Sequence, residues 1–195
     1  MKVLVACEYS GTVRDAFIAR GHDAISIDLL PTERPGPHIE GDLLDSDLGW
    51  FHQFDLMVAH PPCTHLAVSG ARYFAQKQEQ QADALAFVRF LMGLPIRRIA
   101  IENPVSVISS RIRKPDQIIQ PWQFGHPESK TTCLWLTGLP KLTPTNVLPT
   151  PESGRWSNQT PSGQNNLPPS AGRWKIRSTT YQGIAAAMAD QWGSA

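Results

Sequence analysis

Residues 55–63 read DLMVAHPPC, a short apolar run that ends in a histidine, two prolines and a cysteine. Four to eight apolar residues bounded by proline are typical of a buried strand. Proline fixes the backbone dihedral and lacks an amide donor, so Cys63 is expected on a stiff loop directly after that strand. The stretch therefore predicts a strand whose end presents a reactive side chain.

The same pattern recurs on both sides of this stretch. Residues 2–7 (KVLVAC), 23–28 (DAISID) and 98–102 (RIAIE) are short apolar runs, and the segments 12–21 and 77–92 separate runs of this kind. Both segments carry apolar residues at helical spacing, namely Val13, Phe17 and Ile18 in the first and Ala84, Leu85, Val88 and Leu91 in the second. Strands that alternate with helices in this way predict an α/β fold, with a mostly parallel sheet and helices on both faces.

The rest of the chain contains one unusual segment. Residues 131–136 (TTCLWL) predict a further strand, and residues 179–192 predict a short alanine-rich helix. Between them, residues 143–176 hold six prolines and many Ser, Asn, Gln and Gly residues. This composition predicts a long loop. We expect a single domain over residues 1–195 that carries this loop as an insertion.

Composition narrows the function classes. The formal net charge is +1, with 18 basic and 17 acidic residues, so no overall charge draws the chain to a polyanion, although local patches could. Three distant cysteines argue against a disulfide framework and for a reducing compartment. Without a C-x-x-C pair we expect no zinc site. No apolar run approaches the roughly 20 residues of a membrane span, and we expect a cytoplasmic protein without membrane contact.

Polar residues follow each expected strand, where α/β sheets bind their ligands. Cys63 and Glu102 lie after neighbouring strands and combine a thiol with a carboxyl group, which suits nucleophilic catalysis with acid assistance. Each residue also has a structural interpretation when taken alone. Cys63 fits a buried cysteine in a proline turn, and Glu102 fits an acid that caps the next helix.

The pair HPPC (60–63) and IENP (101–104) resembles the two catalytic motifs of the cytosine-C5 methyltransferases, with 39 positions from Cys63 to Glu102. The resemblance implies the Rossmann-like fold of enzymes that depend on S-adenosylmethionine (SAM). It implies that Cys63 attacks carbon 6 of cytosine while Glu102 contacts N3 and the exocyclic amine. Pro62 and Asn103 would then bind substrate.

The resemblance extends over nearly the whole chain except residues 143–176. Asp28 lies where the family binds the ribose of SAM, and Asp42 where it binds the adenine amine. The other residues that it places at the SAM site are Glu8, Ser10, Gly11 and Pro61. GHPESKTTCLWLTG (125–138) resembles a strand that carries two arginines in the family. Lys130 and Thr132 stand in their places as substrate-binding residues, which leaves the contact with cytosine O2 open.

Two substrates remain open, because DNA-acting members of the family insert a large target-recognition region that this chain lacks. One substrate is cytosine in DNA, with low specificity or with a homodimer or partner that completes recognition. The other is a free cytosine nucleotide such as dCMP. Basic and aromatic residues that could hold a strand interleave near the end of the loop, or the tryptophans pin the loop to the domain; they are Arg155, Trp156, Arg173, Trp174, Lys175 and Arg177. A catalytically silent SAM-binding or DNA-binding module is the alternative.

Overall fold

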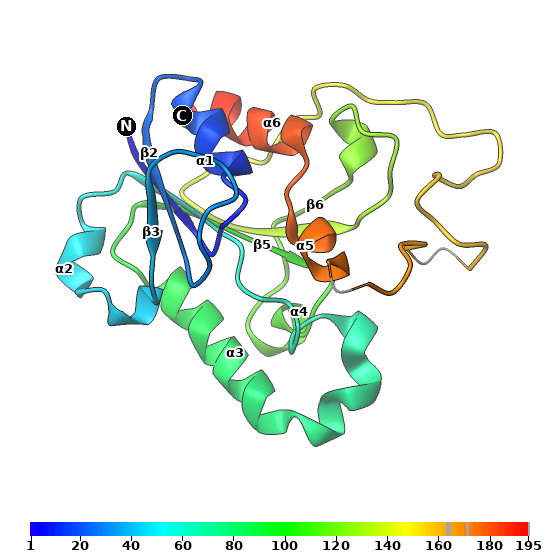
Figure 1. The fold of residues 1–195 in the computed structure, drawn as a ribbon, viewed down its shortest axis with the longest axis horizontal. Coiled ribbons are helices and arrows are strands. Elements are labelled where there is room, and N and C mark those ends of the chain that lie inside the picture. Colours follow the sequence, from blue (N-terminus) through cyan, green and yellow to red (C-terminus); the bar gives the residue numbers. More distant parts are fainter. Residues whose placement is uncertain (163–164, 171, 195) are drawn as a thin grey trace.

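The computed structural model describes residues 1–162, 165–170 and 172–194. Within them, a seven-stranded sheet runs in the order β3-β2-β1-β4-β5-β7-β6 (Figure 1). Its strands are β1 (Lys2–Ala6), β2 (Asp23–Asp28), β3 (His38–Glu40), β4 (Leu56–Ala59), β5 (Arg98–Pro104), β6 (Gln117–Ile119) and β7 (Thr132–Thr137). Strand β7 runs antiparallel to β5 and β6, and the other neighbours are parallel.

Helices cover both faces of the sheet, as the sequence predicted. Successive side chains of β1 are buried on opposite faces of the sheet, because side chains alternate along a strand. Val3 and Val5 pack with α1 (Thr12–Ile18) and α6 (Gln182–Gly193). Leu4 and Ala6 belong to the opposite core, which includes α2 (Leu48–Phe51), α3 (Gln78–Met92) and α4 (Ile108–Arg111). Figure 1 shows α1 and α6 on one side of the sheet and α3 on the other.

The helical spacing of apolar residues marks most of the buried positions. Leu85, Val88 and Leu91 of α3 are buried, as are Val13 and Phe17 of α1. Ile18 was expected on the same face as Val13 and Phe17, but it is 40% exposed. It is the last residue of α1, at the point where the helix ends.

The structure differs from the sequence prediction mainly in short elements. Strands β3 and β6 and three 3-10 turns were not predicted; the turns are η1 (Leu43–Asp45), η2 (Val68–Gln76) and η3 (Pro121–Gln123). The described residues between 143 and 172 form no helix or strand, but α5 (Arg173–Ser178) begins inside the predicted loop. Helix α6 begins at Gln182 rather than at residue 179.

The end of the described chain is bound back onto the sheet. Arg20 of α1 forms an ion pair with Asp190 of α6. The indole of Trp192 donates to the carbonyl of Pro140 at 2.9 Å. These contacts fix α6 against α1, and so place the segment before α6 beside the sheet edge. Of the helices that the structure describes, none has the length and apolarity to cross a bilayer.

Candidate active site

The carboxyl ends of four strands lie level at one edge of the sheet. Ala6 of β1 pairs with Ile27 of β2 and with Ala59 of β4, and Ala59 pairs with Ile101 of β5. The residues that follow these positions therefore form one row across the sheet, namely Asp28, Cys7, His60 and Glu102. Because neighbouring strands lie about 4.8 Å apart, the row measures roughly 14 Å from Asp28 to Glu102.

The loop after β4 is bound to β5 on one side and exposed to solvent on the other. The side-chain amide of Asn103 donates to the carbonyl of Pro61 at 2.8 Å. Asn103 and Pro61 are both buried, whereas Pro62 and Cys63 are exposed. The loop thus presents Pro62 and Cys63 outward, and Asn103 connects it to β5. In this structure Asn103 positions the loop, and its own contact with a substrate remains a prediction.

Glu102 has a partner that the sequence did not predict. Nδ1 of His60 donates to Oε2 of Glu102 at 3.0 Å, and the two side chains are 8% and 13% exposed. Burial raises the pKa of Glu102, but the hydrogen bond and charge of His60, together with the charge of Lys130, outweigh it and lower that pKa overall. Glu102 is therefore a carboxylate in the free protein. The only sequence signal was the position of His60, directly between a strand and two prolines.

The Cys63 thiol lies among charges of both signs. Cys63 is exposed as a residue, yet protein atoms around the sulfur reduce its hydration, and this raises the pKa of the thiol. The negative charge of Glu102 raises it further, while Arg177 and Lys130 lower it without compensating fully. The free protein therefore holds a thiol, with two cations close enough to favour the thiolate.

Lys130 and Thr132 have different surroundings. The Lys130 ammonium donates to the carbonyls of Arg177 at 2.7 Å and Thr179 at 3.5 Å. Lys130 thus fixes the segment that joins α5 to α6 beside Cys63 and Glu102. Thr132 is buried, and its hydroxyl donates to the carbonyl of Lys130 at 3.1 Å. This hydrogen bond is to a residue just before β7, and a role of Thr132 in substrate binding remains a prediction.

A pocket brings Asp28 and Asp42 together at the other end of the row. It is lined by Cys7, Ile27, Asp28, Leu29, Gly41, Asp42, Leu43, Pro62 and Phe87. Burial raises the pKa of Asp28, and the amides of Leu30 and Leu29 and the charges of His38 and His60 offset only part of this. Pro62, predicted for the substrate, lines this pocket as well. The apolar walls from β2, η1 and α3 were not predicted.

A larger pocket lies elsewhere and contains none of these groups. Its lining includes Lys2 and Asp23, which begin β1 and β2, so it lies at the amino ends of the strands. We do not assign it to the site, because the thiol and carboxyl groups lie at the opposite edge. Across the described ranges, no group of three His, Cys, Asp or Glu side chains could hold a metal ion.

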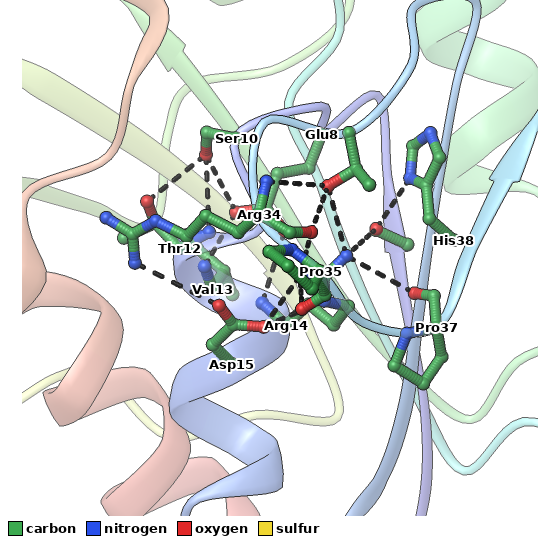
Figure 2. Close-up of polar contacts among 12 residues, drawn as sticks. Glu8, Ser10, Thr12, Val13, Arg14, Asp15, Arg34, Pro35, Pro37 and His38 are labelled. Carbon is green, nitrogen blue, oxygen red and sulfur yellow. Dashed lines mark hydrogen bonds and ion pairs between the residues drawn. The ribbon is translucent and has the colours of Figure 1, made fainter.

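Glu8, Ser10 and Gly11 shape the turn between β1 and α1, and Figure 2 shows the contacts of Glu8 and Ser10. The buried Glu8 carboxylate accepts hydrogen bonds from the amides of Val13 at 2.6 Å and Arg14 at 3.1 Å. The Ser10 hydroxyl donates to the same carboxylate at 3.2 Å. Glu8 thereby satisfies free amides at the start of α1. Contact of these three residues with SAM remains a prediction.

Arg14 is fully buried and holds the loop between β2 and β3, a role that sequence reasoning missed. Its guanidinium donates to the carbonyls of Arg34 at 3.1 Å and Pro35 at 3.3 Å (Figure 2). Gly11 has a φ of +70°, and a Cβ there would lie 2.5 Å from Nη2 of Arg14. The glycine is therefore required both by the turn and by the buried guanidinium beside it.

The basic and aromatic residues near the end of the loop separate into two groups. Trp156 is buried and stacks on Trp122, with ring centroids 6.3 Å apart, so it pins the loop to the domain. Trp174 of α5 is 50% exposed, and its ring centroid lies 5.7 Å from that of Tyr9. The Tyr9 hydroxyl lies 2.7 Å from the hydroxyl of Ser178. Helix α5 is thereby attached to the turn after β1, with part of its basic and aromatic surface exposed.

Comparison with known proteins gives likenesses in structure. No protein-family model and no curated protein sequence matches the chain. A putative DNA modification methyltransferase encoded within an E. coli prophage has 12% identity and a TM-score of 0.50, covering 77% of this chain and 52% of its own. The Entamoeba histolytica methyltransferase EhMeth has 16% identity and a TM-score of 0.54, with coverages of 76% and 57%. S. pombe Dnmt2 has 18% identity and a TM-score of 0.47, with coverages of 72% and 51%.

The first two likenesses concern the fold. With the strand order, they confirm the fold class predicted from the sequence, an α/β fold with a mostly parallel sheet and helices on both faces, which two solved methyltransferases share. The chain spans about half the length of the solved structures that it matches. Activity and substrate have to be argued from the site itself.

Proposed function

We propose that this chain is a SAM-dependent cytosine-C5 methyltransferase, with Cys63 as the nucleophile and Glu102 as the group that binds the pyrimidine ring. One observation carries the proposal. A thiol on the stiff loop after β4 and a largely buried carboxylate near the carboxyl end of the adjacent β5 lie at one sheet edge, and this edge leads to a pocket with two further carboxylates. The fold shared with methyltransferases supports the same assignment.

The Asp28–Asp42 pocket suits the adenosine part of SAM. A carboxylate such as Asp28 accepts hydrogen bonds from ribose hydroxyls, and Asp42 can accept from the adenine amine. The apolar side chains of Ile27, Leu43 and Phe87 offer surfaces for the base. When bound, SAM supplies an electrophilic methyl group.

The chemistry explains why a thiol and a carboxyl group are needed together. The Cys63 thiolate adds to carbon 6, so an S–C6 bond forms and the C5=C6 double bond moves to C4–C5. N3 takes up a proton at the same time, and Glu102 is the group in position to deliver it. Bound SAM would supply the methyl group to carbon 5, with its sulfur leaving as a neutral thioether. Loss of the C5 proton and cleavage of the S–C6 bond restore the ring, and N3 returns its proton.

The proposal covers two substrates, cytosine in DNA and a free cytosine nucleotide such as dCMP. Both carry a phosphate, which suits the cations Lys130 and Arg177 beside Cys63. The exposed Trp174 and basic residues of α5 offer surface for a strand. The formal charge of +1 and the short insertion favour a nucleotide. These observations leave the two substrates nearly balanced.

One experiment decides the function and the substrate together. The protein is incubated with tritium-labelled SAM and, in parallel, with DNA, dCMP, CMP and dCTP, followed by digestion and chromatography of the cytosine. We expect label in 5-methylcytosine from DNA or from one nucleotide. The Cys63→Ala variant is the control and should give none. A protein that binds SAM in calorimetry but labels no substrate would instead be a silent binding module.

A further inference from the structure

We propose that His60 is a positioning residue for Glu102, and that it stores the proton which Glu102 lends to the pyrimidine. This inference rests on the proposed function. His60 and Glu102 occupy adjacent positions in the row across β4 and β5, and Nδ1 of the imidazole lies 3.0 Å from Oε2 of the carboxylate. That distance is within the range over which a general acid passes a proton.

Glu102 needs such a partner because of its charge. A carboxylate has only acceptor sites, and N3 of cytosine is an acceptor too, so the two atoms repel unless a proton lies between them. His60 and Lys130 hold Glu102 in its ionised form in the free protein. The proton for N3 therefore has to come from a neighbour, and the imidazole is hydrogen-bonded to the same carboxylate.

The second nitrogen of His60 points to a role beyond packing. Nε2 is buried and has no hydrogen-bond partner in the part of the chain that the structure describes. Buried polar atoms are nearly always paired, so an unpaired one calls for an explanation. A histidine used only as a structural contact normally has both nitrogens bonded. His60 has one nitrogen committed to Glu102, and its imidazole can carry one proton or two.

Charged groups around the pair act in both directions. Asp28, the last residue of β2, and Glu102 both interact electrostatically with His60. Lys130 acts on Glu102 from the segment before β7, and it opposes a second positive charge nearby. The thiols of Cys63 and Cys133 both lie within the field of Glu102. In the row His60 lies next to Glu102, and Cys7 separates it from Asp28, so Glu102 is the carboxylate within hydrogen-bond reach of its imidazole.

The proton balance of the addition and its reversal closes within the pair, while the protons of the Cys63 thiol and of carbon 5 pass to solvent. As sulfur adds to carbon 6, a ring electron pair moves to N3, which takes a proton through the Glu102 carboxyl group. Nδ1 of His60 gives its proton to that carboxyl group, so the net change is one proton moved from His60 to N3. His60 is then neutral, with its remaining proton on Nε2. When the S–C6 bond breaks, N3 returns the proton through Glu102 to Nδ1.

The test separates hydrogen bonding from proton storage. His60→Asn keeps a side-chain N–H for Glu102 but cannot release its proton, and His60→Ala removes both properties. His52→Asn, which changes an exposed histidine outside the site, is the matched control. The rate is measured as tritium release from 5-tritiated cytosine substrate across a range of pH, with SAM binding and circular dichroism as checks of folding.

We expect both His60 variants to bind SAM normally and to release tritium at neutral pH about a hundredfold more slowly than wild type, the lower end of general acid catalysis. The ratio of their remaining rate to the wild-type rate should rise as pH falls toward the pKa of Glu102, which must then take its proton from solvent; the loss of Cys63 thiolate in acid lowers both rates and cancels in this ratio. A His60→Asn rate within threefold of wild type would overturn the inference, as would an equal loss at every pH.

A second measurement keeps this inference separate from the proposed function. The pKa of Glu102 is measured by carbon-13 NMR of its carboxyl group in wild type and in His60→Ala. We expect it to rise in the variant, because the hydrogen bond and charge of His60 are lost. If wild type releases no tritium from any substrate, the proposed function fails. The titration of Glu102 is then the test of its interaction with His60. An unchanged pKa of Glu102 would then refute the pairing.

Discussion

Opposing influences act on the sulfur of Cys63. Burial and the Glu102 carboxylate favour the thiol, whereas Arg177 and Lys130 favour the thiolate. A nucleophile in this balance is mostly protonated in the free protein and reacts through its minor thiolate form. The rate should therefore rise with pH until the thiol has titrated, and any change in the nearby cations should move that rise.

Substituting Cys63 tests its role as the nucleophile. Cys63→Ala should abolish methyl transfer, and Cys63→Ser should lower it by at least about a thousandfold, because a serine hydroxyl is a poor nucleophile at neutral pH. Transfer is measured with tritium-labelled SAM. Calorimetric binding of SAM should remain close to wild type in both variants. A Cys63→Ser enzyme with near-normal turnover would exclude Cys63 as the attacking group.

The cations near Cys63 can be tested without any assumption about the reaction. Arg177→Gln removes one charge that lowers the pKa of the thiol, so that pKa should rise. The rate of alkylation by iodoacetamide, measured against pH, should then shift to higher pH. Arg155→Gln, in the exposed loop, is the matched control and should leave the curve unchanged. Coincident curves for wild type and Arg177→Gln would show that Arg177 does not act on the sulfur.

Single residues show what the sequence could and could not predict. Cys63 and Glu102 follow short apolar runs that end in proline, so their place at strand ends could be predicted from the letters alone. The hydrogen bond between His60 and Glu102 could not, because it depends on the register of β4 against β5. Glu8 was predicted as a ligand for SAM, and its bonds to the start of α1 appear only when the turn is seen.

Among the elements, strands buried on both faces were the easiest to predict. The predicted bounds of β1, β2, β4 and β5 agree with the structure within two residues, because buried parallel strands are almost continuously apolar. Strands β3 and β6 have only three residues each, which is too short for a recognisable strand pattern. Helix α5 is six residues long and rich in basic residues, and it is held by Tyr9 and Lys130 rather than by its own pattern.

The start of α6 depends on close contact with the loop after η3. A Cβ on Gly183 would lie 2.0 Å from the carbonyl oxygen of Phe124, and the Gly183 amide donates to Nε2 of His126 at 2.9 Å. Gly183→Ala should therefore lower the free energy of unfolding by about 3 kcal/mol, the upper range for overpacking. Urea denaturation measures the change. Gly172→Ala, where a Cβ has open space, should change it little; equal effects would argue against this clash.

At the scale of the whole molecule, one edge of the sheet carries both the Asp28–Asp42 pocket and the Cys63–Glu102 site. The pocket at Asp28 and Asp42 draws its apolar wall from η1 and α3, whereas the Cys63–Glu102 site has the α5–α6 segment beside it. The motifs predicted both ends of the row but not these walls, because Phe87 is far from the motifs in sequence and Leu43, although next to Asp42, belongs to the short η1 turn that no pattern indicated. The described part of the loop after residue 143 extends to one side of the sheet and away from α3 (Figure 1).

Asp28 is predicted to bind SAM at the expense of folding stability. Burial raises its pKa in the folded protein, so ionised Asp28 destabilises the fold at neutral pH, and the destabilisation disappears as pH falls through that pKa. Asp28→Asn should therefore unfold at slightly higher urea concentration than wild type at neutral pH. It should also bind SAM at least about tenfold more weakly, because a charge-assisted hydrogen bond is lost.

The two halves of this prediction have different controls. Asp45→Asn, in the exposed η1 turn beside the pocket, should alter neither urea midpoint nor SAM affinity. SAM affinity of wild type should itself fall in acid as Asp28 becomes protonated, whereas that of Asp28→Asn should be less sensitive to pH. If Asp28→Asn lost stability and kept full affinity for SAM, the carboxylate would be a structural group. The donor pocket would then have to be sought elsewhere along the row.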